Sequence, residues 1–149
     1  MGFLDSISKK NKEVVSDGLE KELEKTLVKD LMSKKLITTP YSTTIYQISK
    51  MMEQGIGAVL VKKDSATVGI ITDRDFAIKI VANKFPLDTP VDKVASFPLQ
   101  TIGPNESILD AAKQMASKKI RKLAVSENNN IVGIITSGDI IRQISRIRK

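Results

Sequence analysis

The chain has 149 residues and a formal net charge of +7, with 41% hydrophobic and 28% charged residues, which is the composition of a compact globular protein. It contains no cysteine and no histidine, which argues against disulfides, thiolate chemistry, metal hydrolase sites and Ser–His or Cys–His nucleophile pairs. Because no stretch is long and apolar enough for a membrane helix and the N-terminus lacks the pattern of a signal peptide, we expect a cytoplasmic protein.

Residues 1–27 are predicted to form an N-terminal amphipathic helical segment. Apolar side chains recur there at one-sided helical spacing, and Asp17-Gly18 interrupts the pattern. We therefore expect a short amphipathic piece, then a firm helix from about Leu19 to Leu27. Its apolar face must pack on the rest of the chain or on another chain.

Residues 28–85 form the first predicted unit, with elements in the order strand, helix, strand, strand, helix. A leading stretch, Val28-Lys29-Asp30-Leu31-Met32, comes before the first strand, and Pro40 is expected to stop that strand. The predicted elements are a strand at 36–39, a helix at 44–54, strands at 58–61 and 68–71 around a polar turn at 62–67, and a helix at 73–82.

Residues 86–149 form the second predicted unit, which repeats this order after a proline-containing linker at 83–90. Its predicted elements are a strand at 99–102, a helix at 107–117, strands at 122–125 and 131–135 around an asparagine turn, and a helix at 137–147. From Met115 onward the chain has eight basic residues against two acidic ones. This basic tail suits an anionic ligand or a polyanion, and an ordinary solvated surface is the alternative.

The two units are copies of one pattern. Residues 37–75 align with residues 101–139 without a gap, at an offset of 64. An internal repeat of this length indicates one folded unit used twice. Both copies end in Gly-Ile-Ile-Thr-x-x-Asp, which predicts a hydroxyl and a carboxylate side by side where a buried strand meets a helix.

The Thr-x-x-Asp spacing has two interpretations. In a capping box, the threonine accepts a hydrogen bond from the first turn and the aspartate three positions later reaches back to the N–H of the threonine. Alternatively, the free N–H groups of the helix N-terminus face an anion while the carboxylate accepts from paired hydroxyls, as a ribose phosphate would require. Both interpretations can hold at once.

These features together resemble the cystathionine β-synthase (CBS) domain, here as a tandem pair over residues 28 to about 147. The resemblance rests on the β-α-β-β-α repeat, the Gly-h-h-Thr-x-x-Asp ending, the Val-Lys-Asp-Leu-Met beginning and the Ile-x-x-h-h-Val strand, where h is an apolar residue. It implies an α/β (α+β) fold of two repeats related by pseudo-twofold symmetry. It also implies clefts between the repeats that bind AMP, ADP, ATP or S-adenosylmethionine, without catalysis.

The resemblance assigns roles to residues of this chain. Asp75 and Asp139 would bind the ribose hydroxyls, and Thr72 and Thr136 would contact ribose or phosphate, with Ser137 beside the latter. The adenine of the Thr136 site would lie on Ile37, Thr38, Gly57 and Ala58, and that of the Thr72 site on Thr101, Ile120, Arg121 and Lys122.

Two arginines are expected to make the sites unequal. Arg121 stands where similar modules often carry a basic phosphate contact, and its counterpart in the first repeat is Gly57. Arg74 is a second phosphate candidate, with Gly138 as its counterpart, although an exposed helix arginine is an alternative reading. We predict that the site of Thr136, Asp139 and Arg121 binds phosphorylated ligands more tightly.

The sequence therefore favours a regulatory module that binds adenosine nucleotides and signals to a separate partner. The alternative is an interaction module for protein or nucleic acid with vestigial nucleotide clefts; an enzyme ranks third because no base or nucleophile pair can be named. Similar pairs dimerise through the long helices, whereas burial within one chain would use the same apolar residues. These residues are Ile78, Ile80, Val81, Ile140, Ile141 and Ile144.

Overall fold

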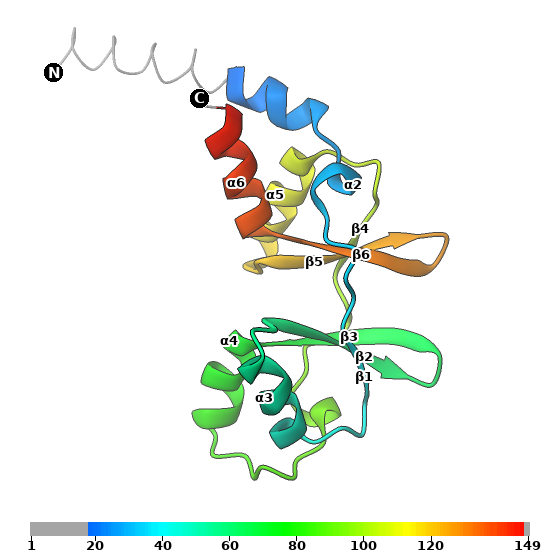
Figure 1. Cartoon of the computed structure of the whole chain (residues 1–149), viewed down its shortest axis with the longest axis vertical. Coiled ribbons are helices and arrows are strands. Elements are labelled where there is room, and N and C mark those ends of the chain that lie inside the picture. The colour runs from blue at the N-terminus through cyan, green and yellow to red at the C-terminus, as the bar shows by residue number, and fades with distance from the viewer. Residues whose placement is uncertain (1–17, 148–149) are drawn as a thin grey trace, which may run out of the picture. The chain divides into compact units, whose positions relative to one another are not determined.

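The structure, a computed structural model, describes residues 18–147 and divides into two compact units (Figure 1). The first-repeat unit runs from Lys35 to Gln100, and the second-repeat unit combines residues 18–34 with residues 101–147. The predicted amphipathic piece before Gly18 and the last two residues of the basic tail lie outside the described residues.

The first-repeat unit is a three-stranded sheet with short helices packed against it. The strand order is β1-β2-β3, with β1 parallel and β3 antiparallel to β2. Its elements are β1 (Thr38–Pro40), α3 (Ile45–Glu53), β2 (Ala58–Lys63), β3 (Ala66–Thr72), α4 (Asp73–Asp75), η1 (Phe76–Val81) and η2 (Val91–Lys93). The predicted order of strand, helix, strand, strand, helix is therefore confirmed.

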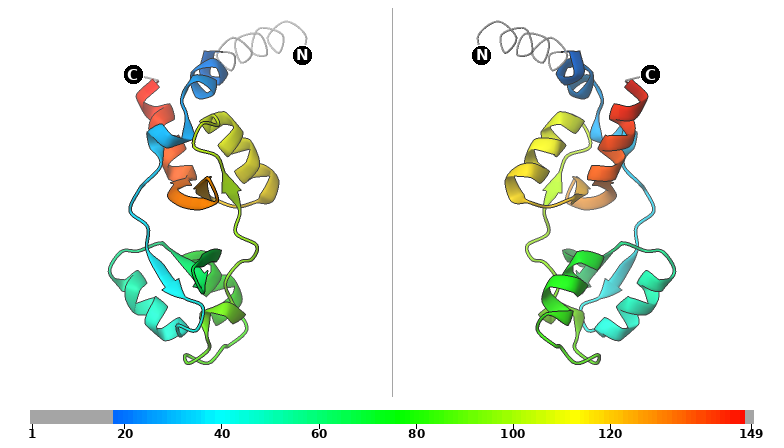
Figure 2. Two further views of the ribbon diagram at one scale, coloured as in Figure 1. Left: turned by 90° about the vertical axis from the view of Figure 1, so that its right-hand side faces the viewer. Right: turned by 90° about the vertical axis from the view of Figure 1, so that its left-hand side faces the viewer.

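The second-repeat unit has the same topology, with the strand order β4-β5-β6. Its elements are a helix over residues 18–25, α2 (Val28–Leu31), β4 (Thr101–Ile102), α5 (Ile108–Lys118), β5 (Lys122–Glu127), β6 (Asn130–Thr136) and α6 (Ser137–Ile147). Asn128 and Asn129 have φ values of 52° and 65°, so the predicted asparagine turn is confirmed. The helices α5 and α6 cover one face of the sheet (Figure 2).

Each unit buries its own apolar core. In the first-repeat unit, helix α3 begins with a capping box at Thr44 and buries Ile45 and Ile48 completely against β2 and β3. In the second-repeat unit, Leu23 of the N-terminal helix is 6% exposed and belongs to the core. Of the two predicted partners, the described part of this helix therefore packs on the rest of the chain, and the helix covers residues 18–25 where about 19–27 was predicted.

The leading stretch of each sequence repeat packs in the unit built from the other repeat. Ser33 pairs with Ile134 of β6, and Ser96 pairs with Ile70 of β3. The predicted domain boundaries at 28–85 and 86–149 describe continuous sequence repeats, whereas each compact unit includes a leading stretch from elsewhere. In the second-repeat unit this stretch is α2 with residues 32–34, and in the first-repeat unit it is residues 91–97.

Three local features differ from the predicted elements. Pro40 is the last residue of β1, not a stop after it, and β1 is an edge strand where a missing N–H is tolerated. The polar turn shrinks to Asp64 and Ser65, because β2 and β3 extend through polar residues at the sheet end. The predicted helix 73–82 is helical from Asp73 to Val81, and its segment Phe76–Val81 is π-helical.

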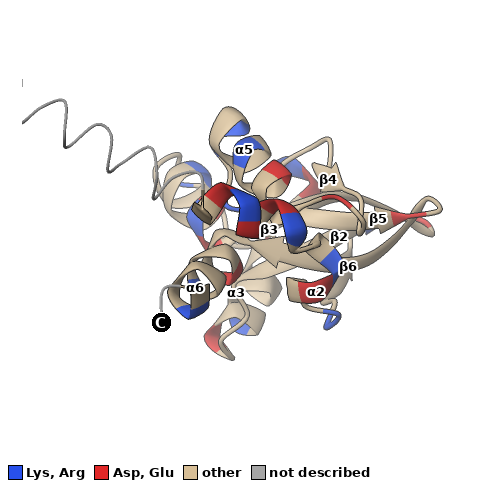
Figure 3. Cartoon of the chain, turned by 90° about the horizontal axis from the view of Figure 1, so that it is seen from above, with Lys and Arg blue, Asp and Glu red and all other residues tan. Residues whose placement is uncertain are grey.

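Charged residues lie on the helices, the turns and the ends of the strands (Figure 3). Among residues 18–147, no helix combines the length and the apolar character needed to cross a membrane.

Candidate functional site

The first candidate corner is the junction of β3 and α4, where Thr72 and Asp75 form a reciprocal capping box. The Thr72 N–H donates to Asp75 Oδ2 at 2.8 Å, and the Asp75 N–H donates to Thr72 Oγ1 at 3.4 Å. The Thr72 hydroxyl also donates to Oδ2, at 3.2 Å. The capping interpretation of the motif is therefore confirmed here.

The second candidate corner is the junction of β6 and α6, with the same exchange of hydrogen bonds. The Thr136 N–H donates to Asp139 Oδ2 at 2.9 Å, and the Asp139 N–H donates to Thr136 Oγ1 at 3.2 Å. The two aspartate side chains are 12% exposed at Asp75 and 16% exposed at Asp139. Each corner thus holds a carboxylate in a fixed position with part of its surface open to solvent.

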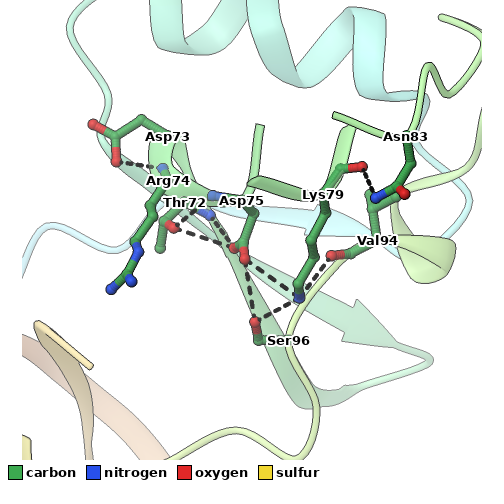
Figure 4. A network of polar contacts seen from close by, with 8 residues as sticks. All are labelled: Thr72, Asp73, Arg74, Asp75, Lys79, Asn83, Val94 and Ser96. Carbon is green, nitrogen blue, oxygen red and sulfur yellow. Dashed lines mark hydrogen bonds and ion pairs between the residues drawn. The ribbon is translucent and has the colours of Figure 1, made fainter. Parts of the chain in front are cut away.

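The surroundings of the two carboxylates differ. Oδ1 of Asp75 contacts the Lys79 ammonium at 3.3 Å and accepts from the Ser96 hydroxyl at 3.4 Å (Figure 4). The same ammonium donates to Ser96 Oγ at 3.0 Å and to the Val94 carbonyl at 3.2 Å. Oδ1 of Asp139 instead accepts from the guanidinium of Arg142, at 2.5 Å, and the Arg142 side chain is 64% exposed.

The residues before β2 and β5 lie beside these corners. The Asp73 N–H donates to the Gly57 carbonyl at 3.2 Å, and the Ser137 N–H donates to the Arg121 carbonyl at 2.8 Å. Gly57 and Arg121 are therefore structural counterparts, as the sequence alignment predicts. Next along the chain, Ala58 pairs with Thr72 and Lys122 pairs with Thr136.

Two guanidinium groups near the corners have no hydrogen-bond or ion-pair partner among the described residues. The side chains of Arg74 and Arg121 are exposed, and neither makes an ion pair or hydrogen bond to another residue of the described chain. Figure 4 shows Arg74 pointing away from the contacts of Asp75. Both remain available to an anionic ligand.

The structure gathers the predicted site residues into two sets, one in each unit. The first-repeat set is Ile37, Thr38, Gly57, Ala58, Thr72, Arg74 and Asp75, and the second-repeat set is Thr101, Ile120, Arg121, Lys122, Thr136, Ser137 and Asp139. Within each set, the threonine, the aspartate and the residues that begin the middle strand are neighbours. The predicted use of adenine-binding residues from the opposite repeat stays a prediction.

Three further residues contact the carboxylates at the corners but were not predicted from the sequence. Lys79 lies four residues after Asp75, and Arg142 lies three residues after Asp139, so helical spacing of opposite charges is a signal that could have found them. Ser96 lies 21 residues from Asp75 and gives no local signal.

Metal-binding residues do not cluster in the described part of the chain, where no group of three or more Asp or Glu is arranged to hold an ion. The corners offer hydrogen-bond acceptors, backbone N–H groups and arginines. Such a set recognises hydroxyl groups and anions.

Comparison with known proteins identifies relatives of this arrangement. The CBS domain family matches residues 28–82 and 88–146. The chain is 37% identical over 120 residues to the CBS domain-containing protein YhcV of Bacillus subtilis, which covers 79% of this chain and 86% of that protein.

Solved structures show the same fold. A conserved protein from Pyrococcus horikoshii is 30% identical, with a TM-score of 0.75 over 80% of this chain and 92% of that one. The CBS domain pair of protein MJ0100 was solved in complex with 5′-methylthioadenosine and S-adenosyl-L-methionine. It is 27% identical, with a TM-score of 0.72 over 82% of this chain and 98% of that one.

Proposed function

This chain belongs to the CBS domain family, and from that premise we propose that it is a regulatory module that binds an adenosine-type ligand through its Thr-x-x-Asp corners. The observation that carries the proposal is the carboxylate of Asp139, which its capping box fixes at the beginning of an eleven-residue helix. A carboxylate in that position accepts hydrogen bonds from a pair of vicinal hydroxyl groups, such as those of ribose. The complex of the related MJ0100 pair with two adenosine derivatives supports the ligand class.

The proposed roles follow the chemistry of each group. Asp75 and Asp139 bind ribose, while Thr72, Thr136 and Ser137 lie at helix N-termini, where N–H groups and the helix dipole favour a phosphate or carboxylate. Arg74 would supply positive charge to an anion at the Thr72 corner, and Arg121 to an anion at the Thr136 corner. The candidates for the adenine are Ile37, Thr38, Gly57, Ala58, Thr101, Ile120 and Lys122.

The ligand itself is proposed to be AMP, ADP, ATP or S-adenosylmethionine. All four carry the ribose and the adenine, and they differ in the charge attached to the 5′ carbon, which the arginines would sense. We propose no catalytic role for any residue, because the corners contain hydrogen-bonding groups without a base paired to a nucleophile. The module would signal by changing its contacts with a partner protein or with a second copy of itself.

A thermal-shift and calorimetric screen tests this function. Adenosine, AMP, ADP, ATP and S-adenosylmethionine are compared with pyrimidine nucleotides and inorganic phosphate; binding to the folded form alone raises the melting temperature. We expect protection by at least one adenosine compound and none by the pyrimidine nucleotides or phosphate. Absence of heat and protection with every adenosine compound would refute the proposal. Salt-dependent retention on nucleic acid would then favour the interaction module instead.

A further inference from the structure

The two aspartates that we propose as ribose ligands differ in how many acceptor positions they have left. An ionised carboxylate has two oxygens with about four lone-pair positions in total. At Asp75, Oδ2 accepts from the N–H and the hydroxyl of Thr72, and Oδ1 receives the Lys79 ammonium and the Ser96 hydroxyl. These four donors use the whole acceptor capacity of Asp75.

The Lys79 ammonium is equally satisfied. An ammonium group has three N–H donors. Lys79 directs them to Asp75 Oδ1, Ser96 Oγ and the Val94 carbonyl, at 3.3, 3.0 and 3.2 Å. The result is a closed network in which every donor and acceptor of the ion pair has a partner from the chain itself (Figure 4).

The carboxylate of Asp139 has only about half of its acceptor positions filled. Among the described residues, its carboxylate accepts from the Thr136 N–H and from Arg142. The Arg142 side chain is 64% exposed, whereas that of Lys79 is 40% exposed and is held by two further acceptors. Exposed ion pairs contribute little free energy, so a ligand can displace Arg142 at small cost.

We infer that Lys79 competes with the ligand at the first-repeat corner, because it fills acceptor positions of Asp75 that a ribose would use. At the second-repeat corner, Asp139 keeps acceptor positions free. A hydrogen bond from a ribose hydroxyl to a carboxylate has one ionised partner, whereas the Lys79–Asp75 contact joins two opposite charges and adds their Coulomb attraction. To bind at Asp75, a ribose must therefore break a stronger contact than it makes. Lys79 thus sets the order of occupancy, with Asp139 binding first. This inference rests on the proposed function.

The test isolates the first-repeat corner in an Asp139→Ala background. Adenosine is the probe because it has no charge of its own, and its affinity is measured by calorimetry. Adding Lys79→Met frees the acceptor positions of Asp75, and we expect adenosine to bind about tenfold more tightly. Adding Asp75→Ala as well should remove this gain. Lys93→Met in the same background is the matched control, because Lys93 is an exposed lysine of the same unit.

The salt dependence of adenosine binding is a second test. If Lys79 had a purely structural role, the affinity for adenosine would not depend on salt. Binding of an uncharged ligand that displaces an ion pair should strengthen as salt screens that pair. In the Asp139→Ala protein, we expect the affinity for adenosine to rise from low to high NaCl concentration. In Asp139→Ala/Lys79→Met, the affinity should be independent of salt. Lys79→Leu, which also lacks a side-chain donor, replaces Lys79→Met if the latter is unfolded at the titration temperature.

The outcomes separate the inference from the function on which it rests. If the unmodified protein binds adenosine but Lys79→Met leaves the affinity of the Asp139→Ala protein unchanged or weakens it, the inference is wrong and the proposed function stands. If no folded variant, including the unmodified protein, binds any adenosine compound, the proposed function is wrong and the inference falls with it.

Discussion

Asp139 serves two purposes with one carboxylate. Its backbone-facing oxygen accepts from the Thr136 N–H and completes the cap of α6, while the other oxygen faces Arg142 near the surface. Loss of a helix cap costs about 1 kcal/mol of stability. The ribose contact proposed for the same group can therefore be removed by mutation without unfolding the protein.

Asp139→Ala is expected to lower the affinity for adenosine at least tenfold, because it removes the carboxylate that has free acceptor positions. The free energy of unfolding should fall by about 1 kcal/mol from the weakened cap. Asp75→Ala is the matched variant in the other repeat and should affect the first binding event much less. Calorimetry with both variants checks this. If Asp75→Ala abolishes tight binding and Asp139→Ala leaves it unchanged, the dominant site lies in the first repeat.

Arg121→Ala is expected to weaken AMP binding about tenfold and to leave adenosine binding nearly unchanged. The guanidinium is exposed and unengaged, so its removal should not disturb the fold, and a charge-assisted hydrogen bond to phosphate contributes roughly 1.5–3 kcal/mol. Titration of both ligands measures the difference. Arg146→Ala, which removes the same charge from the last turn of α6, is the control. Equal losses for AMP and adenosine would contradict a phosphate contact.

At the scale of elements, the glycine of the repeated motif has a packing role. Met32 packs on Gly133, and the ring of Phe97 packs on Gly69. Because glycine has no side chain, each position leaves room for the leading stretch of the other repeat to cross the strand. A Cβ atom on Gly133 would lie 2.6 Å from Met32 Sδ. Backbone that close to a neighbour requires glycine. The duplication of this residue is therefore explained by the fold without a ligand.

Gly69→Ala is expected to lower the free energy of unfolding by about 1–3 kcal/mol, as overpacking typically does. The added methyl group would overlap the Phe97 ring and approach the Ser96 carbonyl oxygen to 2.8 Å. Urea denaturation measures the loss. Gly18→Ala is the control, because nothing lies within 4 Å of a Cβ at that helical position and alanine favours helices. A Gly69→Ala protein as stable as the original would refute this close packing.

The elements with local signals were predicted well. The helix at 137–147 was predicted with its observed bounds, and both β-hairpins and all four Thr and Asp residues of the corners were identified from periodicity and the repeat. The crossing of the leading stretches depends on contacts such as Ser96 with Ile70, which lie far apart in the sequence. Periodicity carries no information about such pairings, so the Ser96 contact of the network around Asp75 could not be predicted for the same reason.

The two copies of the motif also differ in how their last helix packs. In the second repeat the buried residue is Ile140, in the first turn of α6, whereas its counterpart Phe76 is only partly buried. In the first repeat the buried residue is Ile80, within the π-helical segment η1. A π-helix changes the spacing at which side chains return to one face. Residues at equivalent positions of the two repeats therefore differ in which side chains are buried and which are exposed.

At the scale of the whole molecule, the apolar residues of the two long helices divide between core and surface. Ile80 and Ile140 are 5% and 6% exposed and belong to the cores, so the alternative of burial within the chain holds for them. Ile78, Val81 and Ile141 are 53%, 70% and 64% exposed. Large apolar side chains left on helix surfaces in this way suit a contact with another protein surface, and we propose a second copy of this chain.

The homodimer is the last prediction, and it is tested by light scattering at micromolar protein concentration. The unmodified protein should have twice the mass of the chain, and Val81→Glu or Ile141→Glu should shift it toward the monomer, because a buried unpaired carboxylate opposes association. Leu87→Glu is the matched control, since Leu87 is 63% exposed but lies in the loop after η1. It should leave the mass unchanged. A monomer mass for the unmodified protein would contradict the dimer, and dissociation by Leu87→Glu alone would place the interface outside the long helices.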